Sequence, residues 1–64
     1  MKYPDVTVQL SGEDGNVFAI IGRISRALKS AGYADEAAAF QQEAVRCHSY
    51  DEVLGLAFKL VDVR

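Results

Sequence analysis

The run from Val17 to Ala31 constrains the fold more than any other part of the sequence. Its first half carries no charge, and the first charged side chain is Arg23. Apolar residues recur along it at steps of three and four, which is the period of an α-helix with one continuous buried side. A helix that is apolar nearly all round at one end is buried there on more than one face. We therefore expect a helix over residues 16–31 that runs through the centre of the core.

Residues 5–10 have the pattern of a β-strand. Val6, Val8 and Leu10 alternate with polar residues, and this period of two indicates a strand with one buried side. The three apolar residues would face the helices, and the polar residues between them would face outward. Residues 61–63 alternate in the same way, so they are a possible short strand that would lie beside the first one.

Local signals mark the ends of the helices. Asn16 or Asp14 is the expected N-cap of the central helix, because short polar side chains accept hydrogen bonds from the free amides of the first turn. Gly32 is the expected left-handed residue that closes this helix. Further along, Ser49 and Glu52 have the spacing of a capping box, in which each side chain accepts a hydrogen bond from the other end of the turn.

Two more helices complete the predicted fold. One is expected over residues 35–46, with Phe40 as its only large apolar anchor. The other is expected over residues 50–60, and its apolar arc covers about 200° at ~100° per residue. The chain is therefore predicted to be a single α+β domain over residues 1–64, with one N-terminal strand, a three-helix bundle and a possible short C-terminal strand.

Size favours self-association. A chain of 64 residues is close to the length at which one hydrophobic core is marginal. Cys47 is the only cysteine, which excludes an internal disulfide and leaves a structural zinc site short of ligands. The wide apolar arc of the third helix and an unpaired strand edge are both covered easily by a second copy. We expect a homodimer, joined through strands or helices, with an interface drawn from Phe18, Val53, Leu56 and Leu60.

Composition and charge argue against several classes of function. The net charge of −2 gives no broad electrostatic footprint for nucleic acid. No run approaches the ~18 apolar residues of a membrane-spanning helix, and the start has no apolar signal-peptide core. We expect a cytoplasmic protein that binds no membrane. No constellation of residues has catalytic or ligand-binding spacing, so we expect no enzymatic activity, no metal and no cofactor.

The cationic side of the central helix is a candidate partner-binding face. Arg23 and Arg26 lie opposite the apolar stripe, near Lys29. Ala19 and Gly22 beside them would let a helix of a partner approach closely. The plainer interpretation is a solvated charged face. Contact with nucleic acid is a weaker interpretation, because no aromatic residues are interleaved with the cations.

Two other motifs have plainer structural interpretations. The run 12–16 begins a helix, where an anion or a calcium ion could bind, but Glu13 and Asp14 would repel an anion, and the alternating ligands of a calcium loop are absent. We favour a tight turn. The run 47–49 contains Cys, His and Ser, but neighbours in a chain rarely align for proton transfer, and Ser49 already serves as a cap.

Thr7 and Gln9 leave an alternative function open. A strand with outward polar residues, followed by helices, also begins a ribbon-helix-helix regulator, in which two strands pair across a dimer and enter the major groove of DNA. Here no Arg or Lys lies on the strand, the first helix is longer than in that family, and a third helix is present. The alternative is a DNA-binding regulator that reads DNA through Thr7 and Gln9; the simpler interpretation is an edge strand with a polar outer side.

The run VTVQLSGEDGN over residues 6–16 continues into Ile21-Gly22-Arg23 and Ala27-Leu28, and the chain ends near Val61-Asp62-Val63. These segments resemble a group of short uncharacterised proteins from bacteria and their phages. The resemblance implies an origin in a phage, a prophage or another mobile element, and it carries no functional motif. We therefore expect a small, non-enzymatic protein-binding or regulatory module that self-associates and has an unknown protein partner.

Overall fold

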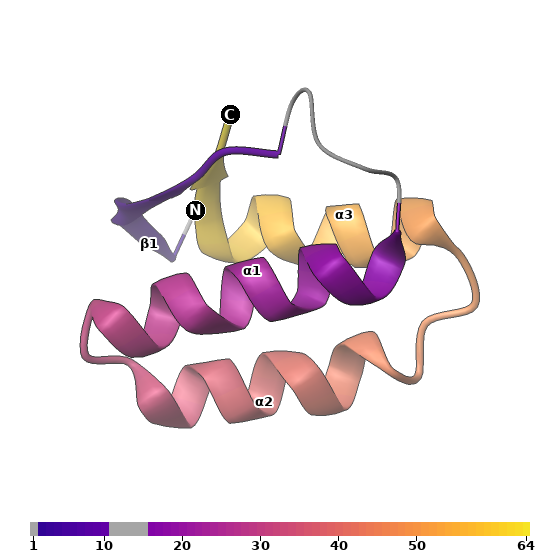
Figure 1. Cartoon of the computed structure of the whole chain (residues 1–64), viewed down its shortest axis with the longest axis horizontal. Coiled ribbons are helices and arrows are strands. Elements are labelled where there is room, and N and C mark those ends of the chain that lie inside the picture. Colours follow the sequence, from indigo (N-terminus) through magenta and orange to yellow (C-terminus); the bar gives the residue numbers. More distant parts are fainter. Residues whose placement is uncertain (1, 11–15) are drawn as a thin grey trace.

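A two-stranded sheet lies beside three helices in the computed structural model of the chain, which describes residues 2–10 and 16–64 (Figure 1). The elements follow in the order β1 (Tyr3–Val8), α1 (Val17–Ser30), α2 (Ala34–Ala44), α3 (Tyr50–Leu60) and β2 (Val61–Val63). This is the α+β arrangement that the sequence predicts. No helix or strand end differs from its predicted place by more than two residues.

The start of α1 is capped by a side chain. The Asn16 carboxamide oxygen accepts a hydrogen bond from the Phe18 amide at 2.9 Å. This bond satisfies one of the amides that have no partner within the first turn of a helix. The other predicted cap, Asp14, lies outside the described residues, as does most of the predicted turn with its anion or calcium loop.

The end of α1 is closed by the predicted glycine. Gly32 has a φ of +95°, in the left-handed region that side chains other than glycine rarely adopt. Its amide donates to the Lys29 carbonyl at 3.0 Å, and the Tyr33 amide donates to the Leu28 carbonyl at 2.9 Å. These two bonds form a Schellman motif, which turns the chain sharply enough for α2 to run back along α1.

The capping box at α3 is present with one difference. Ser49 Oγ accepts a hydrogen bond from the Glu52 amide at 3.2 Å, as the spacing predicts. The Glu52 carboxylate, however, accepts from the His48 amide at 3.0 Å, one residue before the N-cap. The reciprocal bond therefore fixes the last residues of the α2–α3 connection to the first turn of α3.

The two strands pair in parallel, so the beginning and the end of the chain lie side by side. Tyr3 is opposite Val61 and Thr7 is opposite Asp62, which means that β1 advances four residues while β2 advances one. This irregularity contains Pro4, which has no amide to donate to a ladder. The strand therefore begins before Pro4, two residues earlier than the alternation predicts, and the proline lies in the irregular part.

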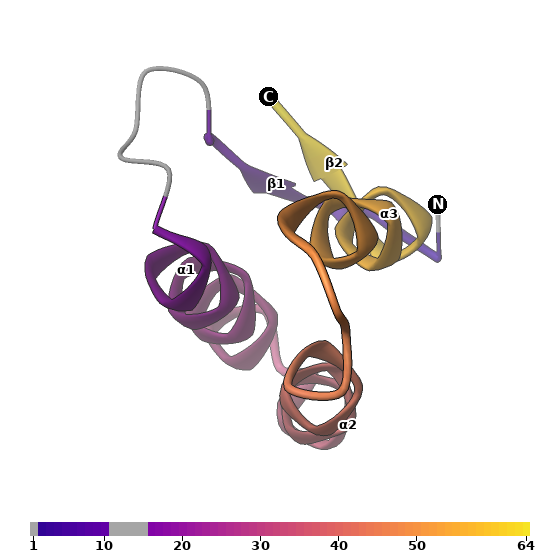
Figure 2. The same cartoon turned by 90° about the vertical axis from the view of Figure 1, so that its right-hand side faces the viewer.

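The core lies between the three helices and the inner side of the sheet. Figure 2 looks along the helices and shows α1, α2 and α3 at three corners, with the strands beside α1 and α3. Val6 and Val8 are buried, whereas Thr7 and Gln9 are exposed, so the predicted faces of β1 are confirmed. The other buried apolar residues are Ile20, Ile21, Ile24, Leu28, Ala37, Phe40, Ala44, Val53, Ala57 and Val61.

Side-chain contacts join the start of β1 to the α1–α2 turn and to the first turn of α2. The Tyr3 and Tyr33 rings stack with their centroids 4.2 Å apart, and the Tyr33 hydroxyl donates to Asp5 at 3.3 Å. Lys2 Nζ lies 2.9 Å from the Glu36 carboxylate. The hydrogen bond from Lys2 lowers the pKa of Glu36, and the Asp5 charge raises the pKa of Tyr33.

Candidate functional site

Exposed apolar side chains gather around one groove. Phe18 is 74% exposed, Val45 68% and Tyr50 38%, and all three border the same hollow. The other exposed large apolar residue of the described part of the chain, Phe58, lies elsewhere on α3. Clustering of this kind is the informative observation, because single exposed apolar side chains are common on any protein surface.

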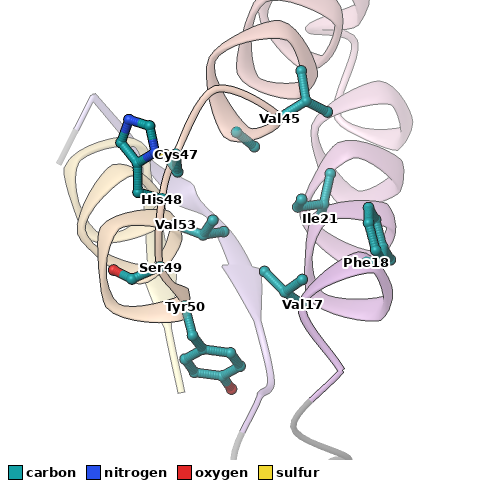
Figure 3. A pocket seen from close by; sticks show the side chains of 10 residues that line it. Val17, Phe18, Ile21, Val45, Cys47, His48, Ser49, Tyr50 and Val53 are labelled. Carbon is teal, nitrogen blue, oxygen red and sulfur yellow. The ribbon is translucent and has the colours of Figure 1, made fainter.

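The groove lies between the first turns of α1, the α2–α3 connection and the start of α3. Its volume is about 660 Å³, and it opens to solvent along one side. Figure 3 shows Val17, Ile21 and Val53 pointing into the space between α1 and α3, whereas Phe18 points along the outer side of α1. The groove therefore has an apolar floor and an apolar rim.

Two polar side chains at the groove, those of Cys47 and Ser49, are engaged in local bonds with the backbone. Ser49 Oγ accepts from the Glu52 amide, and Cys47 Sγ donates to the Glu43 carbonyl at 3.5 Å. His48 is exposed, and its amide donates to Glu52. This arrangement orders the α2–α3 connection and provides no hydrogen-bonded pair of a nucleophile and a base.

We compared the chain with protein-family models, curated proteins and solved structures. No match was found. The origin in a phage or another mobile element, which the resemblance of residues 6–16 implies, therefore stays a prediction. Within residues 2–10 and 16–64, no three His, Cys, Asp or Glu side chains are grouped so that they could hold a metal ion. None of the described helices has the length and apolar character that crossing a membrane requires.

The residues that we predict for a dimer interface lie in two different places on the structure. Phe18 and Val53 line the groove, but Val53 is only 2% exposed and belongs to the core of its own chain. Leu56 and Leu60 are half-buried and line a smaller hollow of about 120 Å³ against α2. The four residues therefore do not form one continuous exposed surface on the folded chain, and the dimer stays a prediction.

The predicted partner-binding face forms one surface. Ala19, Gly22, Arg23 and Arg26 line a shallow hollow of about 380 Å³ on α1, together with Phe18. Phe18 also borders the groove, so the two surfaces adjoin along the first turns of α1. Thr7 on β1 and Gln9 just after it, the candidates for DNA contact, are exposed and line none of these hollows.

Val45 and Tyr50 are the groove residues that the sequence did not predict. Val45 follows the last turn of α2, and Tyr50 begins α3. A helical wheel separates Val45 from the buried Phe40 and Ala44 of α2, which was a usable sign of exposure. No sequence pattern shows that Val45 and Tyr50 border the same groove as Phe18, because this depends on how α1, α2 and α3 pack together.

Proposed function

We propose that this chain is a small, non-enzymatic protein-binding module, and that the groove beside α1 accepts the apolar side of a segment of a partner protein. This proposal rests on one observation: three exposed apolar side chains, those of Phe18, Val45 and Tyr50, border the same apolar groove. Exposed apolar patches that polar residues border are typical of protein-binding surfaces. Aromatic residues are enriched in protein-binding surfaces, and those that become buried on binding often anchor the binding energy.

The groove fits a protein segment better than a small molecule. Small-molecule sites enclose most of their ligand and orient it with a few convergent polar groups. This groove is open along one side, and the hydrogen bonds that Cys47 and Ser49 make are directed at the backbone. An amphipathic helix that lays its apolar side into a groove needs neither enclosure nor convergent polar groups.

A matched pair of phenylalanines tests the proposal. A displayed library of helical peptides is selected on the intact chain, and the binding site of each selected peptide is located by NMR on the labelled protein. Phe18→Ala should weaken the selected peptides at least tenfold, because it removes the anchor at the groove. Phe58→Ala is the control for the groove, since Phe58 is also exposed and does not line it, and sedimentation of both variants at the concentration used reports any change in self-association. Peptides that bind equally to both variants, or that shift only distant amides, would refute the groove as the binding site.

Self-association is the second part of the proposal, and a second flank of α3, which shares only Tyr50 with the groove, supports it. Tyr50, Leu54 and Phe58 are spaced by four residues and therefore share one side of the helix. Tyr50 and Phe58 are exposed and Leu54 is half-buried, so part of the wide apolar arc stays uncovered within the chain. Sedimentation at low micromolar concentration should give a dimer that Phe58→Asp dissociates. A monomer under these conditions would contradict it.

The alternative of a DNA-binding ribbon gains no support from the pairing of β1. The Arg64 amide donates to the Val8 carbonyl at 2.8 Å, so one edge of β1 is already paired within the chain. A ribbon between two copies would have to form on the opposite edge, with Thr7 and Gln9 as its outward residues. Heparin chromatography tests this alternative, because a protein that binds phosphates elutes with a steep dependence on salt.

A further inference from the structure

The surface beside the groove continues between α1 and α2. The hollow that contains Arg26 and Gly22 adjoins a second hollow of about 370 Å³, and both of these residues line it as well. We define the α1–α2 face as Gly22, Ser25, Arg26 and Lys29 of α1 with Ala38 and Gln41 of α2. Because Phe18 borders both the groove and the first hollow, one exposed apolar side chain marks the end of this face.

No contact within the described part of the chain explains why residue 22 is a glycine. It lies inside α1 with a negative φ, and a Cβ added to it would meet no atom within 4 Å. Glycine is the least favourable residue of a helix interior after proline, so alanine would suit this position better in the isolated chain. A glycine on a helix surface does, however, let another helix approach closely.

Ser25 also lacks a partner within the chain. It is 4% exposed, and its hydroxyl makes no hydrogen bond, not even to the preceding turn of α1. Buried polar groups are nearly always hydrogen-bonded, and each exception calls for an explanation. Ser25 lines the hollow between α1 and α2, so this unsatisfied hydroxyl lies directly beneath the α1–α2 face.

The charge of the face has one sign. The sequence of α1 contains three cations and no acidic residue. Among the residues that the structure describes, neither Arg26 nor Lys29 forms an ion pair. The α2 side of the face adds Ala38 and Gln41, which carry no charge. Two copies placed face to face would bring cations against cations, which disfavours a second copy here.

The geometry points to an acidic amphipathic helix of a partner protein as the occupant of the α1–α2 face, an inference that rests on the proposed protein-binding function. Its apolar residues would contact Phe18, its backbone would pass over Gly22, and its carboxylates would lie against Arg26 and Lys29. Along α1, at 1.5 Å per residue, Phe18 is about 12 Å from Arg26 and about 16 Å from Lys29. The apolar and acidic parts of the partner helix should therefore be separated by about two to three turns.

Two synthetic peptides test the chemistry of the partner. One is a 16-residue amphipathic helix of Leu, Ala and Glu, with leucines in its first half and glutamates facing the same side in its second half. The other has lysine in place of every glutamate. NMR titration of the intact chain should show shifts at the α1–α2 face with the glutamate peptide, and at least tenfold weaker binding of the lysine peptide. Raised salt should weaken the glutamate peptide, because the ion pairs are exposed.

Matched variants separate the face from the rest of the protein. Gly22→Gln should keep the fold, because the space beyond its Cβ is open, and should weaken the glutamate peptide at least tenfold by blocking its approach. Gly55→Gln on α3 is the control, since Gly55 also has no atom within 4 Å of an added Cβ and does not line the face. Arg26→Glu should weaken the same peptide, and Lys59→Glu, with the same change of net charge, should not.

Each outcome decides between distinct conclusions. Equal binding of the two peptides at this surface, with loss on Phe18→Ala, would overturn the acidic partner and keep the proposed function. No binding of either peptide would overturn the inference, while the library selection still decides the proposed function on its own. A change of oligomeric mass on Gly22→Gln, measured by sedimentation, would show that a second copy occupies the face and would overturn the inference as well.

Discussion

The same substitution at three glycines should change stability in opposite directions. Gly22 and Gly55 lie inside helices with negative φ, and a Cβ at either position would meet no atom within 4 Å. Gly32 has the same open space, but its φ is +95°. Alanine is therefore compatible with the first two positions and strained at the third. The three sites differ in backbone conformation and not in packing, so they isolate the effect of the backbone.

The magnitudes follow from that difference. Alanine is about 0.8–1.0 kcal/mol better than glycine in a helix interior, so Gly22→Ala and Gly55→Ala should each raise the free energy of unfolding by about 1 kcal/mol. At Gly32 the left-handed backbone costs an alanine about 1–2 kcal/mol. For a domain of this size, a change of 1 kcal/mol moves the melting temperature by roughly 4–8 °C. The two helical variants should melt above the wild type, and Gly32→Ala should melt below it.

Thermal unfolding followed by circular dichroism measures all three effects, and urea unfolding gives the free energies independently. Equal slopes against urea would show that the compactness of the unfolded state is unchanged. The reasoning fails if Gly22→Ala lowers the melting temperature, because a side chain there would then meet something in the folded chain. It also fails if Gly32→Ala is neutral, because the closure of α1 would then not need a left-handed residue.

Three further predictions concern caps, core and charge. Ser49→Ala should cost about 1 kcal/mol, since the Glu52 amide loses its acceptor; an unchanged urea midpoint would contradict this. Ile24 is fully buried, so Ile24→Ala should cost about 2–5 kcal/mol and leave little folded protein by circular dichroism, whereas retained stability would place the core elsewhere. Because the hydrogen bond from Lys2 lowers the pKa of Glu36, the contribution of this pair to stability is present above the ordinary pKa of 4.5 and fades as the pH falls below it. An acid titration of stability should show this loss in the wild type and a smaller loss in Glu36→Gln.

Local signals predicted the elements well because their physical causes are local. Asn16 caps α1, Gly32 closes it, and Ser49 caps α3, each through bonds between residues close in sequence. The alternation of Val6 and Val8 also predicted the buried side of β1. The irregular pairing around Pro4 was not predictable, because a parallel register depends on where α3 places β2, and no local pattern encodes that position.

The candidate site was predicted only in part, since it depends on the angles between helices. The wheel of α1 identified Gly22 and Arg26 as outward-facing, and these residues lie on the α1–α2 face. Val53 lies on the apolar side of the α3 wheel and was predicted for a dimer interface, yet it is buried within its own chain. The amphipathic pattern gives the width of the apolar surface of a helix, but it does not show which neighbouring element covers that surface. Phe58 belongs to the same apolar arc of α3 and is exposed, which the wheel did not show either.

The pairing of β1 with β2 has a consequence for the order of folding. During synthesis, α1 and α2 can form as a local hairpin, while Val6 and Val8 remain unpaired until β2, which follows all three helices, has been made. Closing so long a loop costs little more free energy than closing one of half the length, about 0.6 kcal/mol, so the delay is kinetic. Contacts between residues distant in sequence also slow folding. Although β1 is made before the three helices, it is thus among the last parts of the domain to become protected from pairing with strands of other chains.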